Sequence, residues 1–274
     1  MFHHSEIHHS EEDKINTSNI TDKITGKPPV TVPSRFERKF AVEPANAGFA
    51  LSLLRHVCRA DREYPADRVN SLYFDTEDLD QYEKSGAGAY RKDKVRIRWY
   101  GSDMLKGRGM PVYLELKTRQ GFASSKQRKK FMVPTFSLKA DNLKNGILDR
   151  IAIIETLAEF GYFPEKPLKP IIRISYRRYR FNEMMSGVRV SYDEDIRAVV
   201  VAPEFFRQEA EIRLSNSVIE VKGPKIELPL MLRQLRILNL DWSRFSKYGS
   251  CLDVHFSEPG SVGRSCPSGK LIVP

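Results

Sequence analysis

Cysteine is scarce in this chain, and long apolar runs are missing from it. The 274 residues include three cysteines, Cys58, Cys251 and Cys266, and no two of them form a CxxC pair. This argues against a disulfide framework and against a zinc site, and it favours a reducing compartment. No apolar run approaches the roughly 20 residues that span a bilayer, and the N-terminus lacks the apolar core of a secretion signal. We therefore expect a soluble, cytoplasmic protein with no membrane span.

Histidine is also scarce where chemistry would need it. Four of the six histidines, His3, His4, His8 and His9, stand in the first nine residues, and we interpret them as incidental rather than as a metal site. The rest of the chain offers no Ser/His or Cys/His constellation. Catalysis through a side-chain nucleophile is therefore not expected.

Positive charge is what the chain has in excess. It carries 45 Lys and Arg against 35 Asp and Glu, a formal net charge of +10, and its pI is near 9.4. Such a balance favours a polyanionic partner such as a phosphate chain, a nucleotide or a nucleic acid. Residues 1–33 are polar and aperiodic, and residues 257–274 are rich in Gly, Pro and Ser, so we expect two disordered tails around one domain, 34–256.

The stretch "KDKVRIRWYG", residues 92–101, has a cation at every second position. Because successive side chains of a β-strand point to opposite faces, Lys94, Arg96 and Arg98 would share one face, and Val95 and Ile97 would share the other. The pattern predicts a strand with one basic and one apolar face.

The same alternation recurs along the chain. It is found in "RFERKF" (35–40), "VYLELKTR" (112–119), "SSKQRKKF" (124–131), "GVRVSYDED" (187–195) and "SVIEVKG" (217–223). Helical periodicity is found instead at about 43–60, 141–161 and 227–238. Many strands with few helices predict an α+β fold with a mostly antiparallel sheet.

Two packings of these strands are open on this evidence. The charged faces can point to solvent while the apolar faces form the core. Alternatively, the sheet closes into a barrel whose charged faces line the lumen. Because so many cations cannot lie together without water or anions, such a lumen would have to be wet and would bind a polyanion.

The motifs themselves resemble a known family. "RFERKF", "KVRIRWYG", "YLELKT", "YRRYRF", "VRVSYDEDI", "VIEVK" and "FSKYGSC", in that order, resemble the VTC (vacuolar transporter chaperone) polyphosphate polymerase domain, and the likeness covers about 34–253. That domain belongs to the triphosphate tunnel metalloenzyme superfamily, which also contains the CYTH phosphatases and cyclases. The resemblance implies an antiparallel β-barrel, or triphosphate tunnel, with a basic lumen and with helices packed outside.

The resemblance also implies roles for individual cations. The residues that match tunnel cations expected to stabilise the transferred phosphoryl group are Arg96, Arg98, Lys117, Arg178 and Arg189. Further substrate-binding cations are expected at Lys39, Lys94, Lys126, Arg128, Lys130, Arg244 and Lys247. Arginine suits this task because its fork matches phosphate oxygens bidentately.

The resemblance further implies that Mn²⁺ or Mg²⁺ is held by acidic residues. Glu220 in "VIEVK" matches the carboxylate that binds the metal, and Glu37 and Glu115 are further candidates. For the last two, an ion pair with neighbouring cations is an equal alternative. Arg35 stands where the hydrolase branch has a first glutamate, and this departure favours the polymerase branch, because activation of water by two metal ions needs carboxylate ligands for both.

The function expected from these features is transfer of the terminal phosphoryl group of ATP onto a polyphosphate chain. One alternative is hydrolysis of tripolyphosphate or of a nucleoside triphosphate in the same tunnel, and another is a non-catalytic module that binds polyphosphate or nucleic acid. No specific nucleic acid is expected, because the aromatic run of RNA-binding sheets is missing.

A few notable residues are expected to be structural. The sequence favours a turn pair for Asp193 and Asp195, and packing for Trp99 and Trp242. "NSLYFDT" (70–76) is interpreted as a strand end leading into a turn.

Overall fold

The computed structural model describes residues 36–101, 109–121, 123–205, 211–238 and 245–257. In this part of the chain the strands form one ten-stranded antiparallel sheet with the central order β1-β10-β8-β7-β3-β4-β5-β6, while β2 pairs with β7 and β9 with β8. The strands are β1 (Phe36–Val42), β2 (Cys58–Ala60), β3 (Ala66–Asp75), β4 (Arg91–Tyr100), β5 (Met110–Gln120), β6 (Ala123–Val133), β7 (Lys169–Glu183), β8 (Arg189–Val200), β9 (Glu211–Leu214) and β10 (Ser217–Gly223).

The helical elements are short, with at most 11 residues in the described part of the chain. They are η2 (Pro44–Asn46), α1 (Ala47–Val57), α2 (Asp80–Gly86), η4 (Thr135–Leu138), α3 (Ala140–Leu143), α4 (Arg150–Glu159), η5 (Pro203–Phe205), η6 (Met231–Leu238) and α5 (Lys247–Ser257). No helix in these described ranges is long and apolar enough to cross a membrane.

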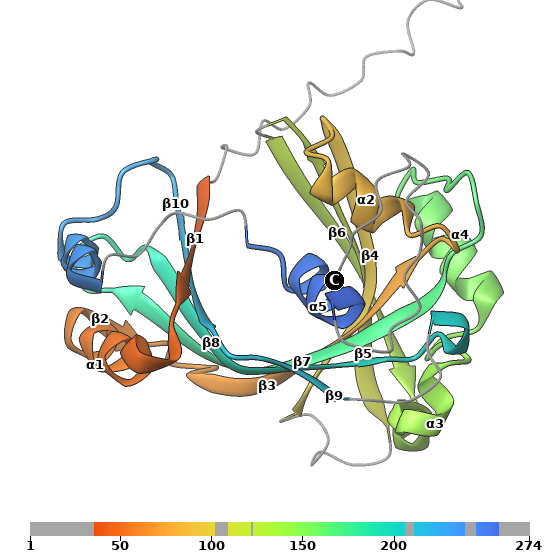
Figure 1. Cartoon of the computed structure of the whole chain (residues 1–274), viewed down its shortest axis with the longest axis horizontal. Coiled ribbons are helices and arrows are strands. Elements are labelled where there is room, and N and C mark those ends of the chain that lie inside the picture. The colour runs from red at the N-terminus through yellow and green to blue at the C-terminus, as the bar shows by residue number, and fades with distance from the viewer. Residues whose placement is uncertain (1–35, 102–108, 122, 206–210, 239–244, 258–274) are drawn as a thin grey trace, which may run out of the picture. The chain divides into compact units, whose positions relative to one another are not determined.

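The sheet curls into a half-barrel (Figure 1). The fold is α+β and antiparallel, as the sequence predicts. The observed sheet is not closed into the expected barrel. The end strands β1 and β6 do not pair with each other within the described residues, so the barrel is open along one side.

Two apolar clusters cover the convex face of the sheet. In one, Val95, Ile97 and Trp99 of β4 pack with Ile153 and Leu157 of α4. In the other, α1 and η6 cover the half of the sheet that has the strand order β1-β10-β8-β7. Buried residues such as Leu54 and Leu235 make this contact. The expected apolar face of residues 92–101 and the packing role of Trp99 are therefore confirmed.

Helix α5 does not follow the expectation that helices pack outside. It lies within the curve of the sheet (Figure 1), where Tyr248, Cys251 and Leu252 contact apolar residues of β7 and β8 such as Ile174 and Ala198. The physical reason is that this end of the concave face is apolar and has to be covered. The two described cysteines, Cys58 and Cys251, are buried and free.

The expected helices are broken at recognisable residues. The segment predicted as 141–161 contains Gly146 at φ 78, a conformation that favours glycine and interrupts a helix. The second helix then begins after Asp149, whose side chain accepts hydrogen bonds from the backbone N–H groups of Ile151 and Ala152. The segment predicted as 227–238 is a 3₁₀ helix over Met231–Leu238.

Candidate functional site

The strand register brings the predicted cations onto one face. Lys94 pairs with Lys117 across β4 and β5, and Lys117 pairs with Lys126 across β5 and β6. On the other half of the sheet, Lys39 of β1 pairs with Glu220 of β10. Because directly paired residues share a face, these side chains lie on the concave face together. We call this set the charged cluster; it comprises Glu37, Lys39, Lys94, Arg96, Arg98, Glu115, Lys117, Lys126, Arg178, Asp193, Glu220, Lys222 and Lys247.

Glu115 of β5 organises one side of the charged cluster. Its Oε2 lies 2.8 Å from Arg96 Nη2 and 3.8 Å from Arg98 Nη1, and its Oε1 lies 2.6 Å from Lys126 Nζ. Burial raises the pKa of Glu115, but Arg96 and Arg98 outweigh this and hold the pKa well below its ordinary value. Glu115 is therefore a carboxylate that three ion pairs hold in place.

Glu37 and Glu220 form the second part of the charged cluster. Lys39 Nζ lies 3.6 Å from Glu37 Oε1 and 3.5 Å from Glu220 Oε1, and Lys222 Nζ lies 2.9 Å from Glu220 Oε2. Lys117 reaches Glu37 Oε2 at 3.1 Å, so β5 and β1 meet across the concave face although 80 residues separate the two in the chain. The two carboxylates are thus neighbours, and they share lysines.

Asp193 is a member of the charged cluster that sequence reasoning missed. It lies within β8, not in a turn, is fully buried, and accepts hydrogen bonds from Arg178 Nε at 2.6 Å and Arg178 Nη2 at 2.7 Å. Lys247 Nζ of α5 lies 2.6 Å from Asp193 Oδ2, the oxygen that also accepts from Arg178 Nη2. Its neighbour Asp195 has φ 49 and pairs with Arg68 and Arg197 instead. The alternation in "VRVSYD" places Asp193 with Arg189, and this signal could have found it.

Tyr73 is a second residue whose role the sequence did not indicate. Its hydroxyl accepts a hydrogen bond from Arg96 Nη1 at 3.0 Å, and its ring stacks on Tyr248 with centroids 5.0 Å apart. Burial raises the pKa of Tyr73, but Arg96 and Arg98 reverse the effect and lower it to about 8. Its parity in β3, shared with Ser71, already places it on the face of Arg98.

The pKa values of two lysines in the charged cluster are shifted in opposite directions by their surroundings. Burial lowers the pKa of Lys94 to about 8, and its Nζ donates a hydrogen bond to the hydroxyl of Ser246 at 2.8 Å. Burial also lowers the pKa of Lys39, but Glu220 and Glu37 reverse this and raise it. Within the described ranges Lys94 thus has no carboxylate in hydrogen-bonding contact, which suits an incoming anion.

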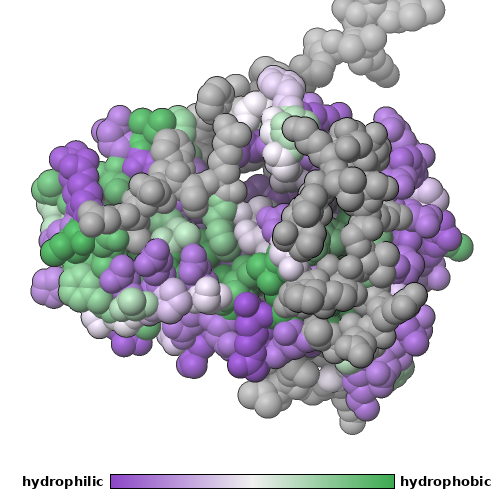
Figure 2. Space-filling view, viewed as in Figure 1, coloured by the Kyte–Doolittle hydropathy of each residue, from purple (hydrophilic) through white to green (hydrophobic). Residues whose placement is uncertain are grey.

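The remaining predicted cations lie toward the edges of the concave face. Arg128 is exposed, with its guanidinium 3.8 Å from the centre of the Tyr113 ring. Lys130 pairs with Tyr113 on the same face and is exposed, and Arg189 is exposed at the start of β8. Arg35, Trp242 and Arg244 lie outside the described residues, as do residues 1–33 and 258–274 of the two expected tails. Ser257, which was expected to begin the second tail, is the last residue of α5. Figure 2 shows this side of the molecule hollowed near its centre, with hydrophilic residues inside the hollow.

The acidic residues fit one small divalent ion better than two. In the part of the chain that the structure describes, no three His, Cys, Asp or Glu side chains gather closely enough to hold a metal by themselves. Glu37 and Glu220 are close enough for each to share Lys39 and Lys222. One or two carboxylates completed by phosphate oxygens and water are the usual ligands of Mg²⁺. Each of the three carboxylates is ion-paired to three cations, but the side chain of Glu115 is 1% exposed, against 8% for Glu220 and 24% for Glu37, so phosphate oxygens and water reach Glu115 least easily.

Comparison with solved structures gives distant likenesses. A candidate adenylyl cyclase from Hippeastrum, described as having a dominant triphosphatase activity, is 17% identical with a TM-score of 0.43, over 80% of this chain and 95% of that one. A candidate adenylate cyclase from Bacillus halodurans is 16% identical with a TM-score of 0.44, over 78% and 95%. A protein from Pyrococcus horikoshii is 13% identical with a TM-score of 0.42, over 80% and 96%.

The sequence itself matches a family directly. No curated protein matches it. The model of the VTC domain, however, matches residues 34–256, which is most of the chain and includes every member of the charged cluster. The chain therefore belongs to the VTC domain family.

Proposed function

We propose that the protein transfers the terminal phosphoryl group of ATP onto inorganic polyphosphate or triphosphate and releases ADP. The observation that carries the proposal is the charged cluster, in which cations from both halves of the sheet and from α5 converge on one concave face and outnumber the carboxylates. A chain of phosphates is the ligand that such a face would take, because each phosphate supplies charge that the carboxylates do not.

Arginines of the charged cluster would hold the phosphates for reaction. Arg96 and Arg98 are fixed by Glu115, and Arg178 is fixed by Asp193, so each guanidinium is oriented before a substrate arrives. Preorganised donors of this kind stabilise the charge that spreads over the equatorial oxygens during phosphoryl transfer. Lys39, Lys94, Lys117 and Lys247 would neutralise the neighbouring phosphates.

The reaction needs no side-chain base. A terminal oxygen of the acceptor chain is already anionic near neutral pH, so it can attack the γ-phosphorus of ATP without losing a proton. The new P–O bond lengthens the acceptor by one phosphate, while the bond from the γ-phosphorus to its bridging oxygen breaks and that oxygen leaves with ADP. In-line positioning of donor and acceptor is then the main contribution of the protein.

Glu220 and Glu37 would hold the metal that the family implies, Mn²⁺ or Mg²⁺. When bound, such an ion neutralises phosphate oxygens and orients them. Lys39 and Lys222, which now share these carboxylates, would turn toward phosphate instead.

Hydrolysis of a triphosphate is the second candidate. The observation in its favour is that water reaches the charged cluster: the side chains of Glu37 and Lys117 are 24% and 38% exposed. Against it, the carboxylates near Arg96 and Arg178 are ion-paired, and their lowered pKa values make them weak bases.

Incubation with ATP and Mn²⁺ tests both candidates. Products are resolved by gel electrophoresis and phosphorus NMR, with an Arg96→Ala/Arg98→Ala double variant as the control. Long chains together with ADP support the polymerase, and orthophosphate alone supports the hydrolase. If neither product forms while polyphosphate still binds, the protein is a binding module and the proposed activity is wrong.

A further inference from the structure

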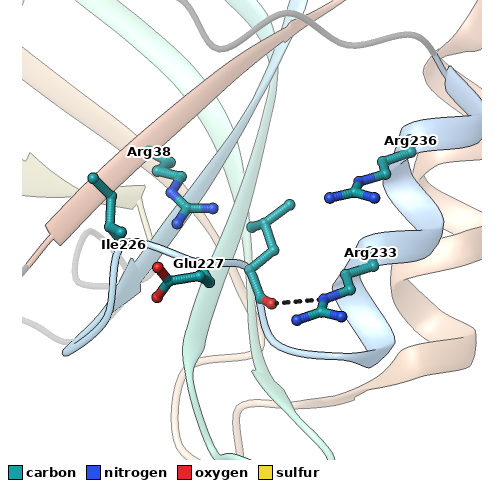
Figure 3. A pocket seen from close by; sticks show the side chains of 6 residues that line it. Arg38, Ile226, Glu227, Arg233 and Arg236 are labelled. Carbon is teal, nitrogen blue, oxygen red and sulfur yellow. Dashed lines mark hydrogen bonds between the residues drawn. The ribbon is translucent and has the colours of Figure 1, made fainter.

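Three arginines meet on the opposite side of strand β1 from the charged cluster. Arg38, Arg233 and Arg236 line a shallow cavity of about 290 Å³ with Ile226, Glu227 and Leu228. Figure 3 shows the guanidinium groups of Arg38, Arg233 and Arg236 turned toward the same space, from β1 on one side and from η6 on the other. Glu227 is the one acidic residue among the lining residues, so the cavity has a local excess of positive charge.

The convergence follows from the geometry of η6. Side chains three residues apart in a 3₁₀ helix lie one above the other. Leu232, Leu235 and Leu238 therefore form a single buried row against the sheet. Arg233 and Arg236 form a second row next to it, which faces the cavity (Figure 3).

The arginines of η6 have little to neutralise them. No ion pair of Arg233 or Arg236 occurs among the described residues, and the hydrogen bond of the Arg233 side chain to the carbonyl oxygen of Leu228 is a long one of 3.5 Å. Arg38 is half-buried; burial lowers its pKa, and the negative charge of Glu227 opposes this. Three guanidinium groups thus line a cavity that has one carboxylate, Glu227. An anion can bind there without displacing an ion pair of Arg233 or Arg236 within the described residues.

The position of Arg38 links this cavity to the charged cluster. It stands between Glu37 and Lys39, which belong to that cluster, and its own side chain points to the other face of β1. Strand β1 is an edge of the sheet in the described part of the chain. A flexible polyanion that passes over this edge would leave the lysines of one face and meet the arginines of the other.

We propose that Arg38, Arg233 and Arg236 form a second polyanion site, which holds the part of a polyphosphate chain that extends beyond the charged cluster. This inference rests on the proposed function for the identity of its ligand. The site would retain long chains between additions, and it would have no contact with a triphosphate bound in the charged cluster. It therefore distinguishes long polyphosphate from short.

The test compares binding of two probes, tripolyphosphate and long-chain polyphosphate, to the wild-type protein and to an Arg233→Glu/Arg236→Glu variant. A Lys139→Glu/Lys144→Glu variant makes the same change in net charge at the two exposed positions that flank α3 and do not line the cavity. An Arg233→Ala/Arg236→Ala variant repeats the measurement without charge reversal, and circular dichroism checks that each variant is folded.

We expect the Arg233→Glu/Arg236→Glu variant to bind the long chain on the order of ten-fold more weakly at low salt. The slope of log affinity against log salt concentration should become less negative by about two, because two phosphate contacts are lost. Tripolyphosphate affinity should be unchanged, and the lysine control should keep its affinity for the long chain.

Unchanged long-chain affinity in both arginine variants overturns the second site. An equal loss in the lysine control overturns it as well, because the effect is then one of net charge. Failure of the proposed function looks different: the wild-type protein would not bind tripolyphosphate, or would not use ATP, whatever the arginine variants do with the long chain.

Discussion

The two ends of the concave face differ in polarity and in what covers them, although the same strands form both. On β7, Ile172 and Ile174 are fully buried beneath α5, whereas Arg178, farther along the same face, is held by Asp193. At the apolar end, helix α5 covers the sheet. At the charged end no apolar cover is possible, because cations there must keep water, carboxylates or a ligand as neighbours. The comparison teaches that the apolar end contributes stability, while the charged end stays open to water and, under the proposed function, to phosphate.

The largest effect should come from a charge placed at the apolar end. Ile174→Asp puts a carboxylate among buried residues, and Ile174 is 0% exposed. Burial of an unpaired charge is among the few mechanisms that cost more than about 4 kcal/mol, so we expect urea denaturation to show a largely unfolded variant. Ile174→Val is the control and should remain folded. A stable Ile174→Asp protein would mean that α5 does not cover this end.

The next largest effect concerns turnover without loss of fold. Arg96→Ala should lower turnover by about 10²-fold or more, because it removes a preorganised donor from the phosphates. Glu115 keeps Arg98 and Lys126 as partners, so the variant should fold. Arg177→Ala is a matched control, since Arg177 is exposed and its strand position points to the opposite face. Equal activity in both variants would place the reaction elsewhere than the charged cluster.

A smaller loss is expected when Glu220, the carboxylate proposed to hold the metal, is neutralised. Glu220→Gln keeps the size of the side chain and removes its charge, so turnover should fall more than triphosphate affinity. Titration of Mn²⁺, with and without a non-hydrolysable triphosphate, should show tight binding only for wild type with the triphosphate present. Equal Mn²⁺ affinity in the variant would assign the metal to Glu37 instead.

Ligand binding should stabilise the charged end selectively. Tripolyphosphate at a hundred times its Kd should add about 2.7 kcal/mol to the free energy of unfolding, because it relieves repulsion among cations that are close together only in the folded protein. Thermal denaturation with increasing salt should show this gain shrinking. A melting temperature that does not move with millimolar tripolyphosphate would contradict every polyanion-binding role for this face.

The smallest effect is a change of affinity with pH. Lys94, with a pKa of about 8, loses its positive charge as pH rises through that value, and Tyr73, also near 8, gains a negative one. Both changes weaken the attraction for phosphate, so calorimetry should show tripolyphosphate affinity decreasing from pH 7 to pH 9. Lys94→Arg should flatten the decrease. A constant affinity in the wild-type protein would show that neither group faces the ligand.

The same two groups determine a trend in stability. In the unfolded chain their ordinary pKa values are 10.5 and 10.0. Between pH 8 and these values the unfolded chain therefore holds more protons than the folded protein. Their contribution to the free energy of unfolding of the ligand-free protein thus increases as pH rises through this window.

Much of the charged cluster was predictable because strand alternation is a local property. Lys94, Arg96 and Arg98 share a face whatever the strand pairs with, and Val95, Ile97 and Trp99 share the other. The α+β class and the antiparallel sheet follow in the same way from repeated alternation between short helical segments. Motifs such as "RIRWYG" were sufficient to indicate the family.

Tertiary structure alone decided which carboxylate meets which cation. Glu37 and Lys117 are far apart in the chain and meet only because the sheet curls. Asp193 lies on the same face as Ala198 because the pairing of β7 and β8 shifts near Asp195, and alternation by itself puts positions 193 and 198 on opposite faces. The position of α5 inside the curve was likewise beyond the sequence pattern, because an apolar helix face does not specify the surface that it covers. The sequence thus determined which side chains share a strand face, and long-range packing decided which of those faces became the concave one and which charges it paired.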